Sequence, residues 1–162
     1  MNVPGFCPLN ISSSRSIHAI DLENELGGTE ATPAQITEFY RIWSTQAVGV
    51  RPGDRVIVST SHRMARNAWF ALPSSIQRVV RSGPSGADTA LIEAIDIPHD
   101  SGRFARLVLG SGDGIFLNLA LDAKRSGMVV QQVLGCGDSN RELTAACTSS
   151  TRIRVGVQSV RI

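Results

Sequence analysis

The sequence has little of what marks the specialised classes of protein. Its three cysteines, Cys7, Cys136 and Cys147, show neither the spacing of a metal site nor the even number of a disulfide framework. A reducing, cytoplasmic compartment is therefore expected. No apolar run approaches the roughly 18 residues of a membrane span, and the N-terminus lacks the basic and apolar segments of a secretory signal. The sequence thus predicts neither a membrane protein nor a disulfide-stabilised secreted one.

Neither sign of charge dominates the sequence, because the formal net charge is only +2. The overall charge gives no argument for nucleic acid, so the placement of individual basic residues must decide. Apolar residues make up 42% of the chain and charged residues 19%, which excludes disorder and indicates a globular fold. At 162 residues we expect a single domain over residues 16–162. It follows a loose lead-in over residues 1–15.

The stretch from Arg106 to Leu134 has the pattern of a strand, a helix and a second strand. A short apolar run precedes Asp113, apolar positions at helical spacing follow it, and a β-branched run over residues 128–134 ends the unit. Such a unit is a crossover between two parallel strands. Asp113 would then follow the carboxyl end of a strand, the edge at which parallel sheets bind ligands.

Strands and helices alternate along the rest of the chain. The expected further strands cover residues 16–21, 55–60 and 76–81, with an edge strand over residues 152–160. The expected further helices begin at Thr32, which forms a capping box with Gln35, at Ser61, near Asp88, and at Ser139, which forms a second capping box with Glu142. This alternation predicts an α/β fold, a three-layer sandwich with a mostly parallel sheet.

Several side chains that could carry chemistry are assigned simpler roles. His18 lies inside the first strand, where a hydrogen-bonded core histidine is commoner than a catalytic base. Trp43 and Trp69 lie on the apolar stripes of helices and are expected in the core. Glu23 and Glu25 follow the first strand and are expected to be solvated.

Three aspartates occupy comparable places in this pattern. Asp21 ends the first strand, Asp88 opens the helix before the strand at Arg106, and Asp113 follows that strand. Each one alone is equally well explained as a turn residue or a helix cap. Because strand ends and the N-termini of the following helices share one edge, the three carboxylates are expected to meet.

Carboxylates brought together repel and raise one another's pKa, and a divalent cation relieves this. Mg²⁺ or Mn²⁺ suits such oxygen ligands, with Asp21, Asp88 and Asp113 as the expected metal site. A cation there can activate a water and stabilise a pentavalent phosphorus centre.

Three short motifs around these aspartates resemble those of NYN domains, a branch of the PIN-like nucleases. Residues 20–24 are similar to the first motif, an aspartate with an asparagine three positions later. Residues 86–91 are similar to the second, a glycine-led aspartate that starts a helix, and residues 111–116 to the third. The order and the spacing agree, and the resemblance covers about residues 16–148.

The resemblance implies a PIN-like fold with strand order 3-2-1-4-5 and metal-dependent cleavage of RNA. It carries over Asp21, Asn24, Asp88 and Asp113 as active-site positions. RNA is the implied partner, and no membrane is involved. Whether the chain forms a homodimer stays open.

Substrate contacts are expected from side chains beside the acids. Ser111 offers a hydroxyl at the same edge. Arg63 and Arg66 follow the second strand and can reach phosphates. The alternative is that both side chains lie on a solvated surface and bind nothing. His62, at the start of the same helix, is a further expected substrate contact.

One position departs from the family's pattern, because Ile115 stands where another acid is common. Glu23 or Asp138 is a possible replacement. The chain is therefore either a weakly metal-binding nuclease or a non-catalytic RNA-binding or adaptor module. A phosphatase of the haloacid dehalogenase type ranks last, since Glu23 stands where that class has a second aspartate.

Overall fold

The structure is a computed structural model that describes residues 14–155. The predicted lead-in over residues 1–15 therefore lies almost wholly outside the described residues, as does most of the predicted strand over residues 152–160.

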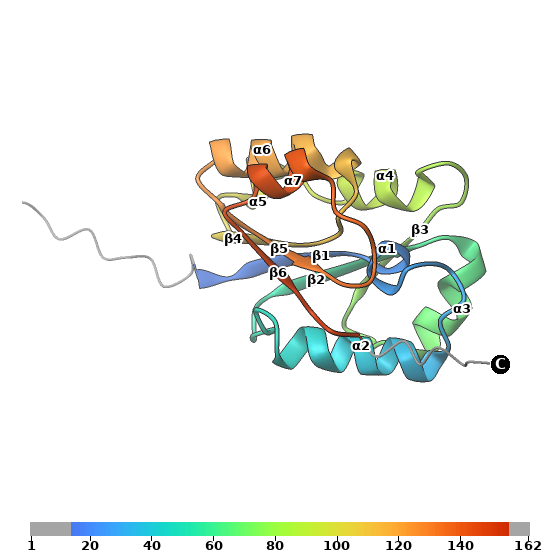
Figure 1. The fold of residues 1–162 in the computed structure, drawn as a ribbon. Helices are drawn as coiled ribbons and strands as arrows, with labels where there is room; N and C mark the ends of the chain where they lie inside the picture. Colours follow the sequence, from blue (N-terminus) through green and yellow to red (C-terminus); the bar gives the residue numbers. More distant parts are fainter. Residues whose placement is uncertain (1–13, 156–162) are drawn as a thin grey trace, which may run out of the picture.

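Six parallel strands form one sheet in the order β3-β2-β1-β4-β5-β6 (Figure 1). The strands are β1 (Ser16–Asp21), β2 (Arg55–Thr60), β3 (Gln77–Val80), β4 (Arg106–Gly110), β5 (Val129–Leu134) and β6 (Ser149–Arg152). The predicted parallel sheet and its order are confirmed, and β6 extends it by one edge strand. That strand begins earlier in the chain than the sequence pattern suggests.

Helices cover both faces of the sheet and complete the predicted three-layer sandwich (Figure 1). One layer holds α2 (Pro33–Thr45) and α3 (His62–Ala71). The other holds α4 (Gly86–Glu93), α5 (Ile97–Asp100), α6 (Leu117–Arg125) and α7 (Arg141–Ala146), with the 3₁₀ turn η2 (Gly114–Phe116) leading into α6. The short helix α1 (Leu22–Leu26) follows β1 directly. Among the described residues, no helix is long and apolar enough to cross a membrane.

The strands bury side chains on both faces, as expected for a covered parallel sheet. Ile17 and Ala19 of β1 join the cluster beneath α4 and α6, whereas Ile20 joins the cluster beneath α2 and α3. Successive side chains of a strand point to opposite faces. Asp21 therefore faces the same layer as Ile17 and Ala19, which is the layer that contains α4.

Helix α2 begins as the sequence predicts. The N–H of Gln35 donates to the Thr32 hydroxyl, and the N–H of Thr32 donates to the Gln35 side chain. The second predicted capping box is wrong, because α7 begins one residue later. Asn140 caps this helix by accepting from the N–H of Leu143, while its own N–H donates to the Gly112 carbonyl.

His18 and Trp43 are core residues, as predicted. His18 is fully buried, and its Nδ1 accepts from the indole N–H of Trp43 at 3.1 Å. Its Nε2 lies 3.1 Å from Asp54 Oδ2 and is therefore the protonated nitrogen that donates to that carboxylate. Burial lowers the pKa of His18, so the ring stays neutral in this role. Trp69 is only half-buried, packed against the same layer.

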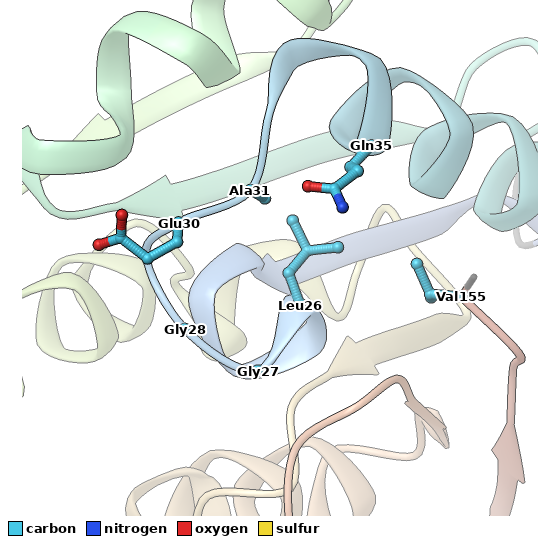
Figure 2. A pocket seen from close by; sticks show the side chains of 7 residues that line it. All are labelled: Leu26, Gly27, Gly28, Glu30, Ala31, Gln35 and Val155. Atoms are coloured by element: carbon cyan, nitrogen blue, oxygen red, sulfur yellow. The ribbon is translucent and has the colours of Figure 1, made fainter. Parts of the chain in front are cut away.

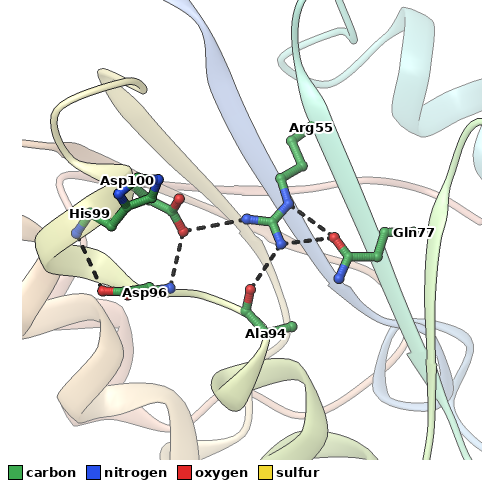
Figure 3. A network of polar contacts seen from close by, with 6 residues as sticks. All are labelled: Arg55, Gln77, Ala94, Asp96, His99 and Asp100. Carbon is green, nitrogen blue, oxygen red and sulfur yellow. Dashed lines mark hydrogen bonds and ion pairs between the residues drawn. The ribbon is translucent and has the colours of Figure 1, made fainter.

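A polar network that the sequence does not reveal anchors the far end of α4 (Figure 3). The guanidinium of Arg55 donates to the Gln77 side chain, to the Ala94 carbonyl and to Asp100. Asp100 is buried and also accepts from the N–H of Asp96. Asp100 is the last residue of the short helix α5. The network ties β2 and β3 to the end of α4, and so fixes the helix that carries Asp88.

Candidate active site

The carboxyl end of β1 places Asp21 at the centre of the sheet's edge. Its side chain is 3% exposed. Asp21 is also the N-cap of α1, and its Oδ1 accepts from the N–H of Asn24 at 3.4 Å. A carboxylate at a helix N-terminus is a favourable arrangement, which explains why this strand ends on an aspartate.

The structure brings Asp88 against Asp21. Asp88 lies in the first turn of α4, and its carboxyl group is within hydrogen-bonding reach of that of Asp21. Burial, followed by this neighbouring carboxyl group, raises the pKa of Asp21 to about 8. The pKa of Asp88 is also raised, by its own burial and by repulsion from Asp113 and Glu23. At neutral pH the pair of carboxyl groups therefore shares one proton.

Ser111 connects the first aspartate to the third. It is fully buried, and its hydroxyl donates to Asp21 Oδ2 at 3.2 Å. The Oγ atom of Ser111 also accepts from the N–H of Asp113 at 3.1 Å. A side chain without solvent access cannot touch a substrate. Ser111 thus positions Asp21, and the predicted role as a substrate contact is not supported.

Asp113 lies at the rim of this cluster. Its side chain is exposed and caps η2, with Oδ1 accepting from the N–H of Ile115 at 3.0 Å. Its charge is close enough to contribute to the raised pKa of Asp88. The three predicted aspartates therefore gather at one edge, but only Asp21 and Asp88 are in direct contact.

Asn24 has a supporting position. Its side-chain oxygen accepts from the N–H of Gly112 at 3.0 Å. This bond joins α1 to the loop that carries Ser111 and Asp113. Gly112 must be a glycine here, because a Cβ atom would clash with the Asp138 backbone. Asn24 is one of the four predicted active-site residues, and in this structure its oxygen orients the others.

Glu23 and Glu25 are not solvated as expected. Glu23 is half-buried, and its carboxylate accepts from both the N–H and the hydroxyl of Ser61, at the start of α3. Glu25 is fully buried, and neither of its carboxylate oxygens has a hydrogen-bond partner among the described residues. Burial raises the pKa of Glu25 to about 8, and the nearby N–H of Gly135, which does not reach hydrogen-bond geometry, and the charge of Arg152 partly oppose this. Loop residues beside a strand look solvated in sequence, but here the β5–α7 loop covers Glu25, with the Cys136 N–H bound to its carbonyl.

Ile115 does not face the aspartates. It is partly buried and packs against the hydrophobic cluster beneath α4 and α6. Asp138, a possible substitute acid, is exposed at the surface. Glu23 is the additional acid beside Asp88, because its charge contributes to the raised pKa of Asp88, although one of its oxygens also accepts from Ser61.

Helix α3, whose start is joined to Glu23 through Ser61, carries basic and aromatic side chains. His62 is exposed, with Nδ1 2.8 Å from the Ser82 hydroxyl, and Arg63 pairs with Glu30 at 2.6 Å. Arg66 is exposed and has no ion pair among the described residues. Phe70, which is 85% exposed, follows at the same four-residue spacing. The sequence does not single out Phe70, since an aromatic residue in a helix is normally expected in the core.

A small cleft of about 110 Å³ opens next to Asp88. Its polar lining comes from Glu23, Ser61, Arg81 and Ser85. Arg81 is held by Glu93 at 2.7 Å. The cleft gives a solvent path to the buried pair of aspartates and places one cation at its wall.

A larger and more apolar cleft of about 230 Å³ lies beyond the other end of α1 (Figure 2). Leu26, Gln35 and Val155 face one another across it, and Glu30 lies at its far end (Figure 2). None of the predicted active-site residues lines it. It is therefore separate from the aspartates, although α1 connects the two.

A divalent cation needs several oxygen ligands, and the aspartates supply some of them. Among residues 14–155, no group of three or more His, Cys, Asp or Glu side chains is arranged to hold a metal ion. Mg²⁺, however, commonly takes one or two carboxylates and keeps several of its waters. Asp21 and Asp88, which share a proton because their charges repel, fit this requirement as a two-carboxylate site.

Comparisons with known proteins identify the fold but not the family. Neither a protein-family model nor a curated protein sequence matches the chain. The chain is similar to the crystal structure of a protein of unknown function from Vibrio parahaemolyticus, with 15% sequence identity and a TM-score of 0.56. The match covers 89% of this chain and 95% of that one. At this identity the likeness shows a common α/β fold alone.

Proposed function

We propose that this protein is a divalent-metal-dependent ribonuclease that hydrolyses phosphodiester bonds at the carboxyl edge of its sheet. The contact between Asp21 and Asp88 carries the proposal. A stable fold gains nothing from two carboxyl groups pressed together with a raised pKa, whereas a cation site does. The resemblance of residues 20–24, 86–91 and 111–116 to NYN motifs supports RNA as the substrate.

Asp21 and Asp88 would hold Mg²⁺ or Mn²⁺ in place of the proton that they share. When bound, the cation supplies an activated water and stabilises charge on the phosphorus. Ser111 and Asn24 keep the ligands in place through their bonds to Asp21 and Gly112. Asp113 Oδ1 accepts from the backbone N–H of Ile115. The second carboxylate oxygen of Asp113 would face the substrate from the rim of the cluster.

The RNA strand is proposed to follow the exposed face of α3. His62, Arg66 and Phe70 share this face at four-residue spacing, over about 12 Å of helix axis. The first two side chains suit phosphates, and Phe70 offers a surface on which a base can stack. The N-terminus of α3 is joined to the acid cluster through the bond between Ser61 and Glu23. Arg63 contributes less, because Glu30 already neutralises it.

The cytoplasm is the proposed location, and RNA the proposed partner. Cys136 and Cys147 are free thiols, which suits a reducing compartment.

A non-catalytic RNA-binding module is the second candidate. The packing of Ile115 against the core favours it, because this position, at which an acid is common in the family motif, supplies no ligand. Such a module would keep the RNA path along α3 without cleavage.

The deciding experiment incubates the purified protein with end-labelled single-stranded RNA in EDTA, Mg²⁺ or Mn²⁺. We expect cleavage with the metals only, and none by D21N or D88N. D122N is the matched control, since Asp122 is an exposed aspartate on α6 that pairs with Arg125. RNA binding without cleavage by the wild type would favour the adaptor module. Cleavage that D88N retains would refute the assignment of the site, and hydrolysis of a simple phosphate ester but not of RNA would favour the phosphatase.

A further inference from the structure

The apolar cleft of about 230 Å³ at the end of α1 has a polar side chain on one of its walls. Leu26 and Val155 form apolar sides, and both pack against the hydrophobic cluster beneath α2 and α3. Gln35, in the first turn of α2, faces them across the cleft (Figure 2). The cleft therefore suits an apolar group that turns a polar edge toward Gln35.

The capping box of α2 fixes which atom of Gln35 the cleft meets. The N–H of Thr32 can only donate, so the Gln35 atom that it contacts at 2.9 Å must be the side-chain oxygen. The amide nitrogen is then the end that is turned toward Leu26 (Figure 2). Among residues 14–155, this nitrogen has no hydrogen-bond partner. Gln35 thus offers N–H donors to the cleft, while its oxygen is engaged by the backbone.

The charge around the cleft indicates a neutral occupant. Among the described residues of its lining there is no cation, and Glu30 at its far end is anionic. Arg63 belongs to α3 and not to the lining, and it pairs with Glu30 at 2.6 Å. A phosphate group is therefore a poor occupant, whereas a neutral group with a carbonyl oxygen can accept from Gln35.

The cleft adjoins the helix along which the RNA is proposed to run. Residues 27–31 form one wall of the cleft, and two contacts hold this loop to α3. Arg63 pairs with Glu30, and the side-chain amide of Asn67 donates to the Ala31 carbonyl at 3.2 Å. An RNA strand that follows α3 therefore passes close to the cleft.

Helix α1 joins the cleft to the aspartate pair. Leu26, on the wall of the cleft, lies five residues after Asp21, which corresponds to about 7 Å along the helix axis. The cleft and the aspartates are thus at opposite ends of one short helix. A single RNA strand can contact both.

We propose that this cleft is a subsite for one unpaired base of the RNA, and that it prefers uracil and guanine to cytosine and adenine. The inference rests on the proposed function for its substrate, RNA, but not on the cleavage step. The Gln35 N–H would donate to O4 of uracil or O6 of guanine. Cytosine and adenine carry an amino group at that position, so that two donors would meet and stay unpaired.

The test measures fluorescence anisotropy in EDTA with single-stranded oligouridylate and oligocytidylate of equal length, and then the cleavage of both in Mn²⁺. We expect the wild type to bind oligouridylate about fivefold more tightly, because one hydrogen bond is gained and unpaired donors are avoided. Q35E keeps the capping box, since a carboxylate also accepts from the Thr32 N–H, but it presents an acceptor to the cleft. Its preference should therefore reverse toward oligocytidylate.

Q46E is the matched control for the added charge. Gln46 is exposed at the other end of α2, so the substitution adds the same negative charge to the same helix without touching the cleft. Q46E should keep the wild-type preference for oligouridylate, even if both affinities fall alike. Melting curves of both variants show whether they are folded, and the preference of the wild type tests the subsite without any variant.

The outcomes separate the subsite from the nuclease. Equal affinity of the wild type for the two oligonucleotides, or an unchanged preference in folded Q35E, would overturn the subsite, even if Mn²⁺ supports cleavage. A uracil preference that Q35E reverses, without cleavage in Mn²⁺, would support the subsite and refute the proposed catalysis. If the wild type binds neither oligonucleotide, the RNA substrate and the subsite are refuted together.

Discussion

The carboxyl group of Asp21 lies against that of Asp88, at the point where β1 ends and α4 begins, and the two share a proton. Ser111 holds the first of these groups from behind, and solvent reaches the second through a small cleft. The pair is thus held by Ser111 on one side and accessible to solvent on the other. Such an arrangement is the basis of the cation site that we propose.

Affinity for Mn²⁺ should rise with pH up to about 8, because Asp21 must lose its proton before the cation binds, and the pKa of Asp21 is raised to that value. Because one proton is displaced, the affinity for Mn²⁺ should rise about tenfold per pH unit below the pKa of Asp21. Calorimetric titration at several pH values measures this. D88N should bind Mn²⁺ weakly at every pH, and a wild-type affinity that does not change with pH would contradict the exchange of a proton for the cation.

Substitution of Glu25 should change how stability depends on pH. Its pKa is raised in the folded state to about 8, so the folded protein binds more protons than the unfolded chain between its ordinary pKa and that value. Stability must therefore fall as the pH rises through this interval, by up to about 1.4 kcal/mol per pH unit. E25Q removes this contribution and should be the more stable protein near pH 8.

Urea unfolding of the wild type and E25Q from about pH 5 to pH 8 tests this expectation. E142Q is the control, since Glu142 is exposed on α7. Parallel pH profiles for wild type and E25Q would show that Glu25 ionises normally in the folded protein.

Replacement of Phe70 and Arg66 should weaken RNA binding in different ways. F70A removes a stacking surface and should cost about 1–3 kcal/mol at every salt concentration. R66A removes a phosphate contact and should flatten the salt dependence of binding. Both are measured by fluorescence anisotropy with single-stranded RNA in EDTA, so that cleavage plays no part.

Val129 provides the control for Phe70, because it is the other large exposed apolar side chain of the described residues and lies at the start of β5. V129A should bind RNA as the wild type does. If F70A binds equally well, the RNA path does not cross α3, whatever the outcome for cleavage.

An acid at position 115 should destabilise the protein and not restore a metal site. The sequence alone suggests that I115D supplies the missing ligand. Ile115 instead packs against the core, so a charge there loses hydration, at an expected cost of about 1–3 kcal/mol. Urea unfolding and Mn²⁺ titration of I115D beside I115V decide between these. An equally stable I115D with tighter Mn²⁺ binding would show that the side chain turns toward the cation.

The alternation of β and α patterns was enough to predict the layered α/β fold, whereas the order of five strands was implied only by the resemblance to NYN domains. Each signal is local: apolar runs form strands, Thr32 and Gln35 cap a helix, and an aspartate at a strand end also caps the next helix. The rule that strand ends share an edge then brings Asp21, Asp88 and Asp113 to one region. These features depend on neighbouring residues and on chain topology, so they can be read from sequence.

Tertiary packing alone decided which of those side chains touch and which are buried. Asp21 meets Asp88 but not Asp113, and Ser111 lies beneath them where a substrate cannot reach it. These contacts depend on the tilt of α4 and the path of the loops, which no local pattern encodes.

The same holds for the residues that the sequence placed wrongly or did not single out. Glu25 is buried because the β5–α7 loop closes over it. Leu26 and Val155 face one cleft only because the chain after β6 comes beside α1 and α2. Burial and the meeting of distant side chains are properties of the assembled layers, whereas the sequence determines the elements from which those layers are built.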